Sequence, residues 1–303
     1  MDTAPVRGVG EGLSIVKVIT LLLAASTAAV SFAAVPAARA ADVTEEAPAS
    51  YAAPVVDDKG NWGFEVGAIG LTKPKYEGSS QYRFLGFPIV IPHYYGDNYD
   101  PKTRSRFSFR GLDDVRYAVL RYGDLDIGPL AGYTFGRDDS DGARLKGLGD
   151  VDGGVILGGF AEYHFDPFFV DVALGDQITG DASGAYTVKA GVGADFAVTD
   201  RLVLSPYLSA TYASGDYMDK YFSVTSAQSA RSDAGLDRFD ADAGIKDISF
   251  QIEGKYRLSK RWSARSTLGY SRLVGDAADS PVTADADQFS ALVGLTYTFG
   301  RTD

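Results

Sequence analysis

Cysteine is absent from the 303-residue chain, and methionine, tryptophan and histidine occur only twice each. Without cysteine the chain can form no disulfide, and it can hold no zinc or iron–sulfur centre through thiolates. Two histidines are few for an enzyme that relies on histidine for acid–base chemistry. The composition therefore favours a non-enzymatic protein without a bound cofactor or metal.

Basic residues are also scarce, because 29 Lys and Arg stand against 40 Asp and Glu, for a net charge of −11. A nucleic-acid binder needs a positive surface facing phosphate. We therefore expect no nucleic-acid partner. With 12% aromatic residues, the chain is also too rich in core-forming side chains to be disordered.

Long apolar runs are missing except near the N-terminus, which excludes a bundle of membrane helices. There, basic residues precede an apolar stretch at 18–35, and Ala38-Arg39-Ala40 follows it. These are the parts of a secretory signal peptide. We predict a signal peptide over 1–40, with cleavage between Ala40 and Ala41. A membrane anchor or a buried helix is the alternative interpretation.

Residues 41–61 are rich in alanine, proline and acidic residues, and they predict a flexible periplasmic leader. From Trp62 to the end, apolar and polar residues alternate with a period of two, which is typical of β-strands. Many segments reach the roughly nine to eleven residues that a tilted strand needs to cross a membrane. About twelve such segments occur, near 62–71, 84–95, 104–110, 115–122, 125–135, 153–165, 168–176, 185–198, 202–212, 246–258, 262–272 and 289–299.

Short turns alternate with long connections that are rich in Asp and Gly. Outer-membrane barrels have short periplasmic turns and longer external loops. We therefore predict an all-β fold over 62–303, a transmembrane antiparallel β-barrel of about 12 strands. The short turns lie at 166–167, 199–201 and 259–261, and the long connections at 136–152, 177–184, 213–245 and 273–288.

Aromatic residues cluster near the predicted strand ends. Such clusters indicate the interfacial girdles of a membrane barrel, although strand propensity alone also enriches aromatic residues. The residues are Trp62, Tyr94, Tyr95, Phe165, Phe168, Phe169, Trp262, Tyr270, Tyr297 and Phe299.

Charged residues on the predicted strands are expected to line the lumen. One interpretation is a selective pore, and the other is a barrel closed by its own ion pairs. The expected lining residues are Arg104, Arg106, Arg110, Asp126, Glu162, Asp171, Lys189, Asp195, Glu253, Lys255, Arg257 and Arg265.

Catalytic motifs are missing, since no Gly-x-Ser-x-Gly, His-Glu-x-x-His or Walker pattern occurs. His93 and His164 fall at the predicted periplasmic ends of strands, and we expect structural or lumen-facing roles for them. The acidic loops 213–245 and 273–288 leave two interpretations open. They are either solvated, or bridged by divalent cations to lipopolysaccharide phosphates.

Several short motifs together resemble the MipA/OmpV family of outer-membrane proteins. The resemblance covers Trp62 to Phe299 and implies a barrel in the outer membrane of a Gram-negative bacterium. The motifs are Pro74-Lys75-Tyr76-Glu77-Gly78-Ser79, Gly128-Pro129-Leu130, Tyr133-Thr134-Phe135-Gly136-Arg137, Tyr221-Phe222-Ser223-Val224-Thr225, Asp279-Ser280-Pro281-Val282 and Tyr297-Thr298-Phe299.

The resemblance also implies a scaffold that links a lytic transglycosylase and a bifunctional murein synthase to the outer membrane. Its lipid surroundings would be outer-membrane lipid and lipopolysaccharide. The family defines no catalytic residues. A porin-like channel for small solutes is the alternative function.

We predict that the mature protein fractionates with the outer membrane and migrates differently on gels before and after boiling. A folded transmembrane barrel keeps its closed hydrogen-bonded wall until it is heated. Recovery of the protein in the soluble periplasmic fraction would contradict both the fold and the function.

Overall fold

The computed structural model describes residues 62–94 and 105–300. The predicted signal peptide, its cleavage site between Ala40 and Ala41, and the leader 41–61 lie outside the described residues. Tyr95 and Arg104 also lie outside them. Among the described residues, no helix has the length and apolarity needed to cross a membrane.

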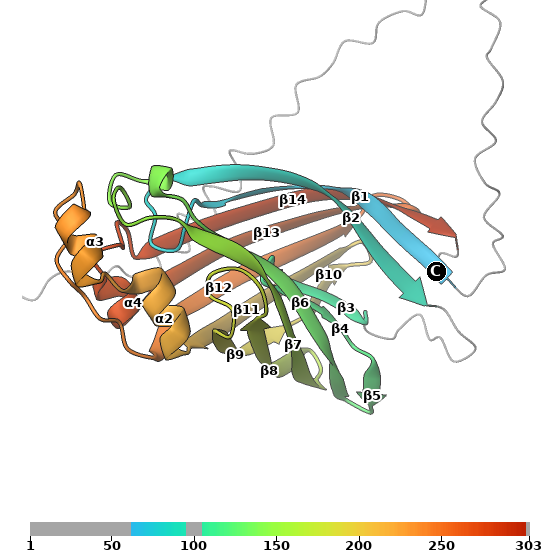
Figure 1. Ribbon diagram of the computed structural model, residues 1–303. Coiled ribbons are helices and arrows are strands. Elements are labelled where there is room, and N and C mark those ends of the chain that lie inside the picture. Colours follow the sequence, from blue (N-terminus) through green and yellow to red (C-terminus); the bar gives the residue numbers. More distant parts are fainter. Residues whose placement is uncertain (1–61, 95–104, 301–303) are drawn as a thin grey trace, which may run out of the picture. The chain divides into compact units, whose positions relative to one another are not determined.

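The described chain is built almost entirely of antiparallel strands that form one sheet (Figure 1). Twelve strands follow one another in the order β2-β1-β14-β13-β12-β11-β9-β8-β7-β6-β4-β3, while β10 pairs with β11 and β5 with β6. The prediction of an all-β antiparallel fold of about 12 strands is confirmed. The strands are β1 (Trp62–Pro74), β2 (Tyr82–Tyr94), β3 (Phe107–Gly111), β4 (Asp114–Tyr117), β5 (Leu120–Tyr122), β6 (Leu125–Arg137), β7 (Val151–Phe165), β8 (Phe168–Gln177), β9 (Tyr186–Ala194), β10 (Phe196–Thr199), β11 (Leu202–Ala213), β12 (Gly244–Arg257), β13 (Trp262–Leu273) and β14 (Asp287–Gly300).

Two of the expected strands are interrupted. The segment 115–122 breaks between β4 and β5, where the Arg106 guanidinium donates to the carbonyl oxygens of Ala118 and Val119 at 2.8 and 3.2 Å. The segment 185–198 breaks at Asp195, whose carboxylate accepts from Ser205 Oγ at 2.6 Å. At the first break a side chain satisfies backbone carbonyls in place of the regular ladder. At the second, the Asp195 amide donates to the Pro167 carbonyl at 2.8 Å.

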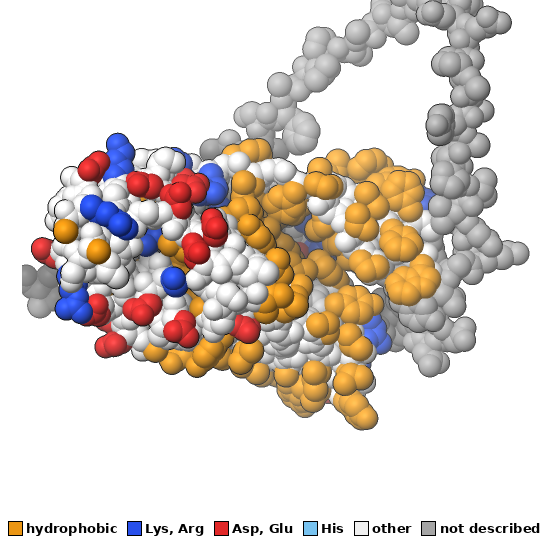
Figure 2. All heavy atoms as spheres, in the orientation of Figure 1, with side chains coloured by type: hydrophobic (Ala, Val, Ile, Leu, Met, Phe, Trp, Pro, Cys, Tyr) orange, Lys and Arg blue, Asp and Glu red, His pale blue; other side chains and the backbone are white. Residues whose placement is uncertain are grey.

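The outer face of the sheet is apolar, as Figure 2 shows over the strands. Phe84, Val293 and Val90 expose 72, 63 and 59% of their surface. An apolar surface this extensive is expected where strands face lipid rather than water.

The aromatic residues next to the short turns follow the predicted girdle, with one exception. Trp62, Phe168 and Trp262 are 48, 45 and 42% exposed. Phe169 is only 1% exposed and stacks on Tyr207 inside the sheet, so its assignment to the girdle is wrong. Neighbouring residues in a strand point to opposite faces, and Phe168 occupies the outer one.

The long connections contain short helices that the sequence pattern did not predict. Ser214 and Thr225 accept backbone hydrogen bonds at the N-termini of α2 and α3, as capping residues do. Figure 1 shows the helices gathered at one end of the strands. They are the 3₁₀ helix η1 (Asp139–Asp141), α2 (Gly215–Phe222), α3 (Ser226–Arg231) and α4 (Asp276–Asp279).

These connections pack into a roof with its own small core. Met218 and Phe222 of α2 are 1 and 0% exposed and belong to one apolar cluster with Ala277 of α4. A second cluster joins Leu145 to Val282 from another connection. The burial of apolar side chains from distant loops therefore holds the roof together.

We predict that Gly193→Ala destabilises the barrel, because a Cβ there would lie 2.2 Å from the buried Phe169 ring. Overpacking of this kind costs roughly 1–3 kcal/mol. The measurement is the temperature at which the heat-dependent gel shift occurs. Gly86→Ala is the control, since its Cβ would meet nothing within 4 Å. Equal transition temperatures for the two variants would contradict the packing.

Candidate functional site

Arg116 of β4 lies at the centre of an ion-pair network inside the sheet, with none of its surface exposed. Its guanidinium donates to both carboxylate oxygens of Asp114 at 2.6 and 2.8 Å, and to Asp171 of β8 at 2.9 Å. The second Asp171 oxygen accepts from the Tyr207 hydroxyl at 2.9 Å. The network therefore links β4 to β8 and β11 through fully paired buried charges.

Two further cations extend this network. Arg110 of β3 donates to Glu162 of β7 at 3.1 Å, and its guanidinium carbon lies 4.6 Å from the ring centres of both Phe169 and Tyr207. Lys189 of β9 donates to Asp114 at 3.1 Å. Side chains from β3, β4, β7, β8, β9 and β11 thus meet across the interior.

A smaller group of charges lies on the opposite part of the sheet. Arg265 of β13 pairs with Glu65 of β1 at 2.9 Å and with Glu253 of β12 at 3.4 Å. Thr296 donates its hydroxyl to Glu65 at 2.6 Å. Glu65 and Thr296 are 2 and 0% exposed, while Arg265 and Glu253 are half-buried.

His164 is 5% exposed and lies against the ring of Phe169. Its Nε2 atom is 2.9 Å from Glu162 and 3.7 Å from Asp126, which Arg121 also pairs through two hydrogen bonds. His93 lies in β2. The contacts of His164 are those of a packed residue within the ion-pair network.

The structure brings together most of the charged residues that were expected to line the lumen. Arg110, Glu162, Asp171 and Lys189 belong to the main network, with Asp126 at its edge, and Glu253 with Arg265 form the smaller group. Lys255 lies partly buried in β12.

The remaining three described residues of that set are exposed. The Arg106 side chain contacts the break between β4 and β5, and Asp195 lies at the break between β9 and β10. Arg257 donates to the Asp200 carbonyl at 2.6 Å.

Sequence reasoning missed the central residues Asp114 and Arg116, and also Glu65. Glu65 alternates with Phe64 and Val66, which are 42 and 37% exposed. Because neighbouring strand residues point to opposite faces, the apolar Phe64 and Val66 could have predicted that Glu65 points inward.

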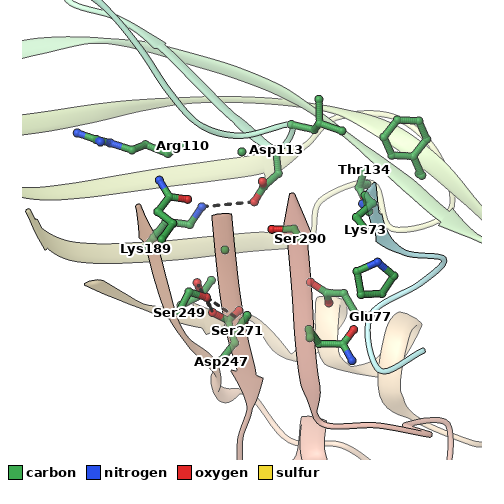
Figure 3. A pocket seen from close by; sticks show the side chains of 18 of the residues that line it. Lys73, Glu77, Arg110, Asp113, Thr134, Lys189, Asp247, Ser249, Ser271 and Ser290 are labelled. Carbon is green, nitrogen blue, oxygen red and sulfur yellow. Dashed lines mark hydrogen bonds and ion pairs between the residues drawn. The ribbon is translucent and has the colours of Figure 1, made fainter. Parts of the chain in front are cut away.

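A cavity of about 300 Å³ lies between the main network and the roof (Figure 3). Tyr217 and Tyr221 of α2 line it together with residues from nine strands and the β1–β2 connection. Lys246 pairs with Glu77 at 2.5 Å and with Asp247 at 2.9 Å. Figure 3 shows serines of three neighbouring strands, Ser249, Ser271 and Ser290, on the same wall.

Tyr217 of the roof remains a hydrogen-bond donor. Burial raises the pKa of its hydroxyl well above the usual value, and the nearby carboxylate of Glu77 acts in the same direction. The neutral hydroxyl donates to Glu77 at 3.0 Å. The roof is thereby tied to the β1–β2 connection.

The acidic loops form no cluster that suggests a metal site. Over residues 62–94 and 105–300, no group of three or more Asp, Glu or His residues is arranged to hold a metal ion. Asp276 instead accepts from the backbone amide of Asp242 at 2.8 Å.

We predict that Arg116→Met lowers the stability of the barrel strongly. The substitution leaves Asp171 buried without its ion-pair partner and Asp114 paired with Lys189 alone, and breaking a buried pair costs roughly 3–5 kcal/mol. The temperature of the heat-dependent gel shift should fall. Arg201→Met, at an exposed position in a short turn, is the control and should change little. An unchanged Arg116→Met transition would show that the network contributes nothing.

Comparison with known proteins identifies relatives of this architecture. Residues 66–299 match the family described as MltA-interacting protein MipA. The chain is 28% identical to the outer membrane protein OmpV of Vibrio cholerae serotype O1, over 80% of this chain and 87% of that one. It is also 28% identical to the outer membrane protein Omp26La of Vibrio anguillarum, with the same coverage.

Two solved outer-membrane proteins are among the structures that align with the chain. OmpT of Vibrio cholerae aligns at a TM-score of 0.33 and 8% identity, covering 80% of this chain and 100% of that one. The channel DcaP of Acinetobacter baumannii aligns at 0.35 and 10%, covering 78 and 96%. On its family match and its curated relatives, the chain belongs to the MipA family and is an outer-membrane protein.

Proposed function

We propose that this protein is a non-enzymatic scaffold that holds murein-hydrolysing and murein-synthesising enzymes at the outer membrane. The observation that carries the proposal is the family match over 66–299, because that family is described by its interaction with MltA. The partners we propose are a lytic transglycosylase and a bifunctional murein synthase.

The interior of the sheet supports an anchoring role over transport. Arg116 and its partners cross the interior at 0–7% exposure, and the α2–α4 roof packs over the opposite end of the cavity. A solute would have to separate paired buried charges to pass, which is strongly unfavourable. This arrangement favours the second interpretation of the lumen residues, a barrel closed by its own ion pairs.

The short-turn end of the sheet is the surface we assign to the partner enzymes. Short turns of outer-membrane barrels face the periplasm, and β1 begins at this end paired with the end of β14. Arg201 and Lys260 are exposed on two turns, and Arg257 is exposed at the end of β12, which pairs with β11. This basic patch and the leader 41–61 together form the proposed contact.

Deletion of residues 42–58 is expected to weaken capture of a lytic transglycosylase from solubilised envelope by the tagged protein.

The turns are tested separately by the double variant Arg201→Ser with Lys260→Ser, which removes two exposed positive charges and is also expected to weaken capture. Its control is Arg238→Ser in the roof-side connection, also exposed. Capture that survives both changes, with the gel shift intact, would refute this contact surface. Failure of the intact protein to capture either enzyme would refute the scaffold.

The rival function is a diffusion channel for small solutes, and planar-bilayer recordings separate the two. We expect no stable openings from the purified protein, because the interior is crossed by paired charges. Stable openings that change with Glu253→Ala, while Arg106→Ala at an exposed site leaves them unaltered, would establish the channel instead.

A further inference from the structure

The cavity beneath the roof has an excess of positive charge. Six basic side chains line it against three acidic ones, although the whole chain is acidic. Arg110, Lys189 and Lys246 have carboxylate partners in the networks described above. The other three basic residues have no Asp or Glu oxygen within 4.0 Å in the described part of the chain, and they are Lys73, Lys75 and Arg137.

Two of these cations lie near β6: Arg137 is its last residue, and Lys73 lies over the ring of Phe135, two residues before it. Arg137 is 3% exposed, donates to the Tyr221 carbonyl at 3.0 Å, and has an Nε atom with no hydrogen-bond partner. Lys73 reaches from β1 to the ring of Phe135, with Nζ 5.1 Å from its centre. Arg137 is a buried cation without a carboxylate partner, which is costly unless an anion joins it. Lys73 is half-buried, and Asp113 and Glu77, which also line the cavity, attract its charge. Their arrangement favours an anionic ligand.

The wall of the sheet is incomplete beside these cations. The last pair between β4 and β6 is Val115 with Ala131, and β6 continues for six residues to Arg137. Beyond the hydrogen bond from the Tyr133 amide to the Leu112 carbonyl, the described residues provide no further partner for this edge of β6. The described part of β2 likewise has a partner strand only on its β1 side.

In the described part of the chain, the short β3–β4 hairpin therefore leaves a window between β2 and β6. Figure 2 shows a hollow in the apolar face at the corresponding place in the orientation of Figure 1. The ion pair of Arg83 with Asp141, at 2.7 Å, joins the roof-side ends of the two edges. The β3–β4 turn at Leu112 and Asp113 forms the opposite boundary.

The surroundings of the window are apolar on both faces. Outside, Phe84 is 72% exposed and Tyr133 44%. Inside, Leu85, Phe87 and Leu112 pack into one cluster near Leu71. An alkyl chain would contact apolar side chains along this path, while a charged group would meet Lys73 and Arg137 at its inner end.

We propose that the cavity binds the phosphate or carboxylate head group of an anionic membrane amphiphile. The head group lies beside Lys73 and Arg137, and its alkyl chain leaves through the window between β2 and β6 into the membrane. A cavity of about 300 Å³ is at the small end of ligand sites. It suits a head group whose chain stays largely outside.

Native mass spectrometry of the full mature protein, in neutral maltoside detergent, tests this directly. The probes are lysophosphatidylglycerol, zwitterionic lysophosphatidylcholine, and glycerol 3-phosphate as the head group without a chain. We expect one equivalent of lysophosphatidylglycerol to bind in preference to the other two. Equal binding of lysophosphatidylcholine would overturn the anion site, and equal binding of glycerol 3-phosphate would overturn the route from the membrane.

Single substitutions locate the site. Lys73→Met and Arg137→Met should each weaken lysophosphatidylglycerol binding by roughly tenfold, the effect of losing one charge-assisted hydrogen bond. Lys260→Met is the control, in an exposed turn at the end of the strands opposite the roof, and it should leave lysophosphatidylglycerol binding unchanged. Lys73→Gln serves as a second variant, and each protein is used only if it keeps the gel shift. Full binding by both Lys73 variants would overturn the proposal.

Discussion

The pairing of Arg116 with Asp114 and Asp171 is the interaction on which the rest of the interior depends. β3 and β4 have only five and four residues, and β4 shares two paired positions with β6. Such a short hairpin has too few ladder bonds to fix its place in the wall. Buried side-chain pairs to β8, together with Lys189 of β9, supply the missing constraint. The same residues fill the interior that the hairpin borders.

The position of the β3–β4 hairpin determines both how the interior is filled and where the window between β2 and β6 lies. Because the hairpin pairs with β6 only near Leu130 and Ala131, its charges cross the interior there. On the edge of β6 away from β7, the described residues place no strand beside the segment that leads to Arg137. The cavity therefore has the main ion-pair network on one side and the packed roof on the other. The window between β2 and β6 lies beside it. Both proposals, a scaffold at the membrane and a site for the head group of an anionic amphiphile, rest on this interior. It is poorly suited to pass solutes.

The period-two pattern was sufficient to predict the strands, their apolar outer face and the alternation of short turns with long connections, because these depend on local sequence. It could also have placed Glu65 inside. The error at Phe169 came from assigning it by its distance from a turn, although its neighbour Phe168 already occupied the outer face.

The roof and the window could not be predicted in this way. α2 has eight residues, and its buried side depends on Ala277 and other residues from distant connections. Arg116 lies in a four-residue strand, where alternation is too brief to be distinctive. The window arises because β3 and β4 are much shorter than β6. The sequence alone does not show which strands pair, so it could not predict this gap.

The absence of cysteine allows the accessibility of the cavity to be measured with single introduced thiols. Ser290→Cys places one on the cavity wall, and Lys260→Cys places one in an exposed turn. In isolated outer membranes, a lipid-soluble maleimide should label both thiols, whereas a charged, membrane-impermeant maleimide should label only Lys260→Cys. Rapid labelling of Ser290→Cys by the impermeant reagent would contradict a lumen closed to water and reached from the membrane.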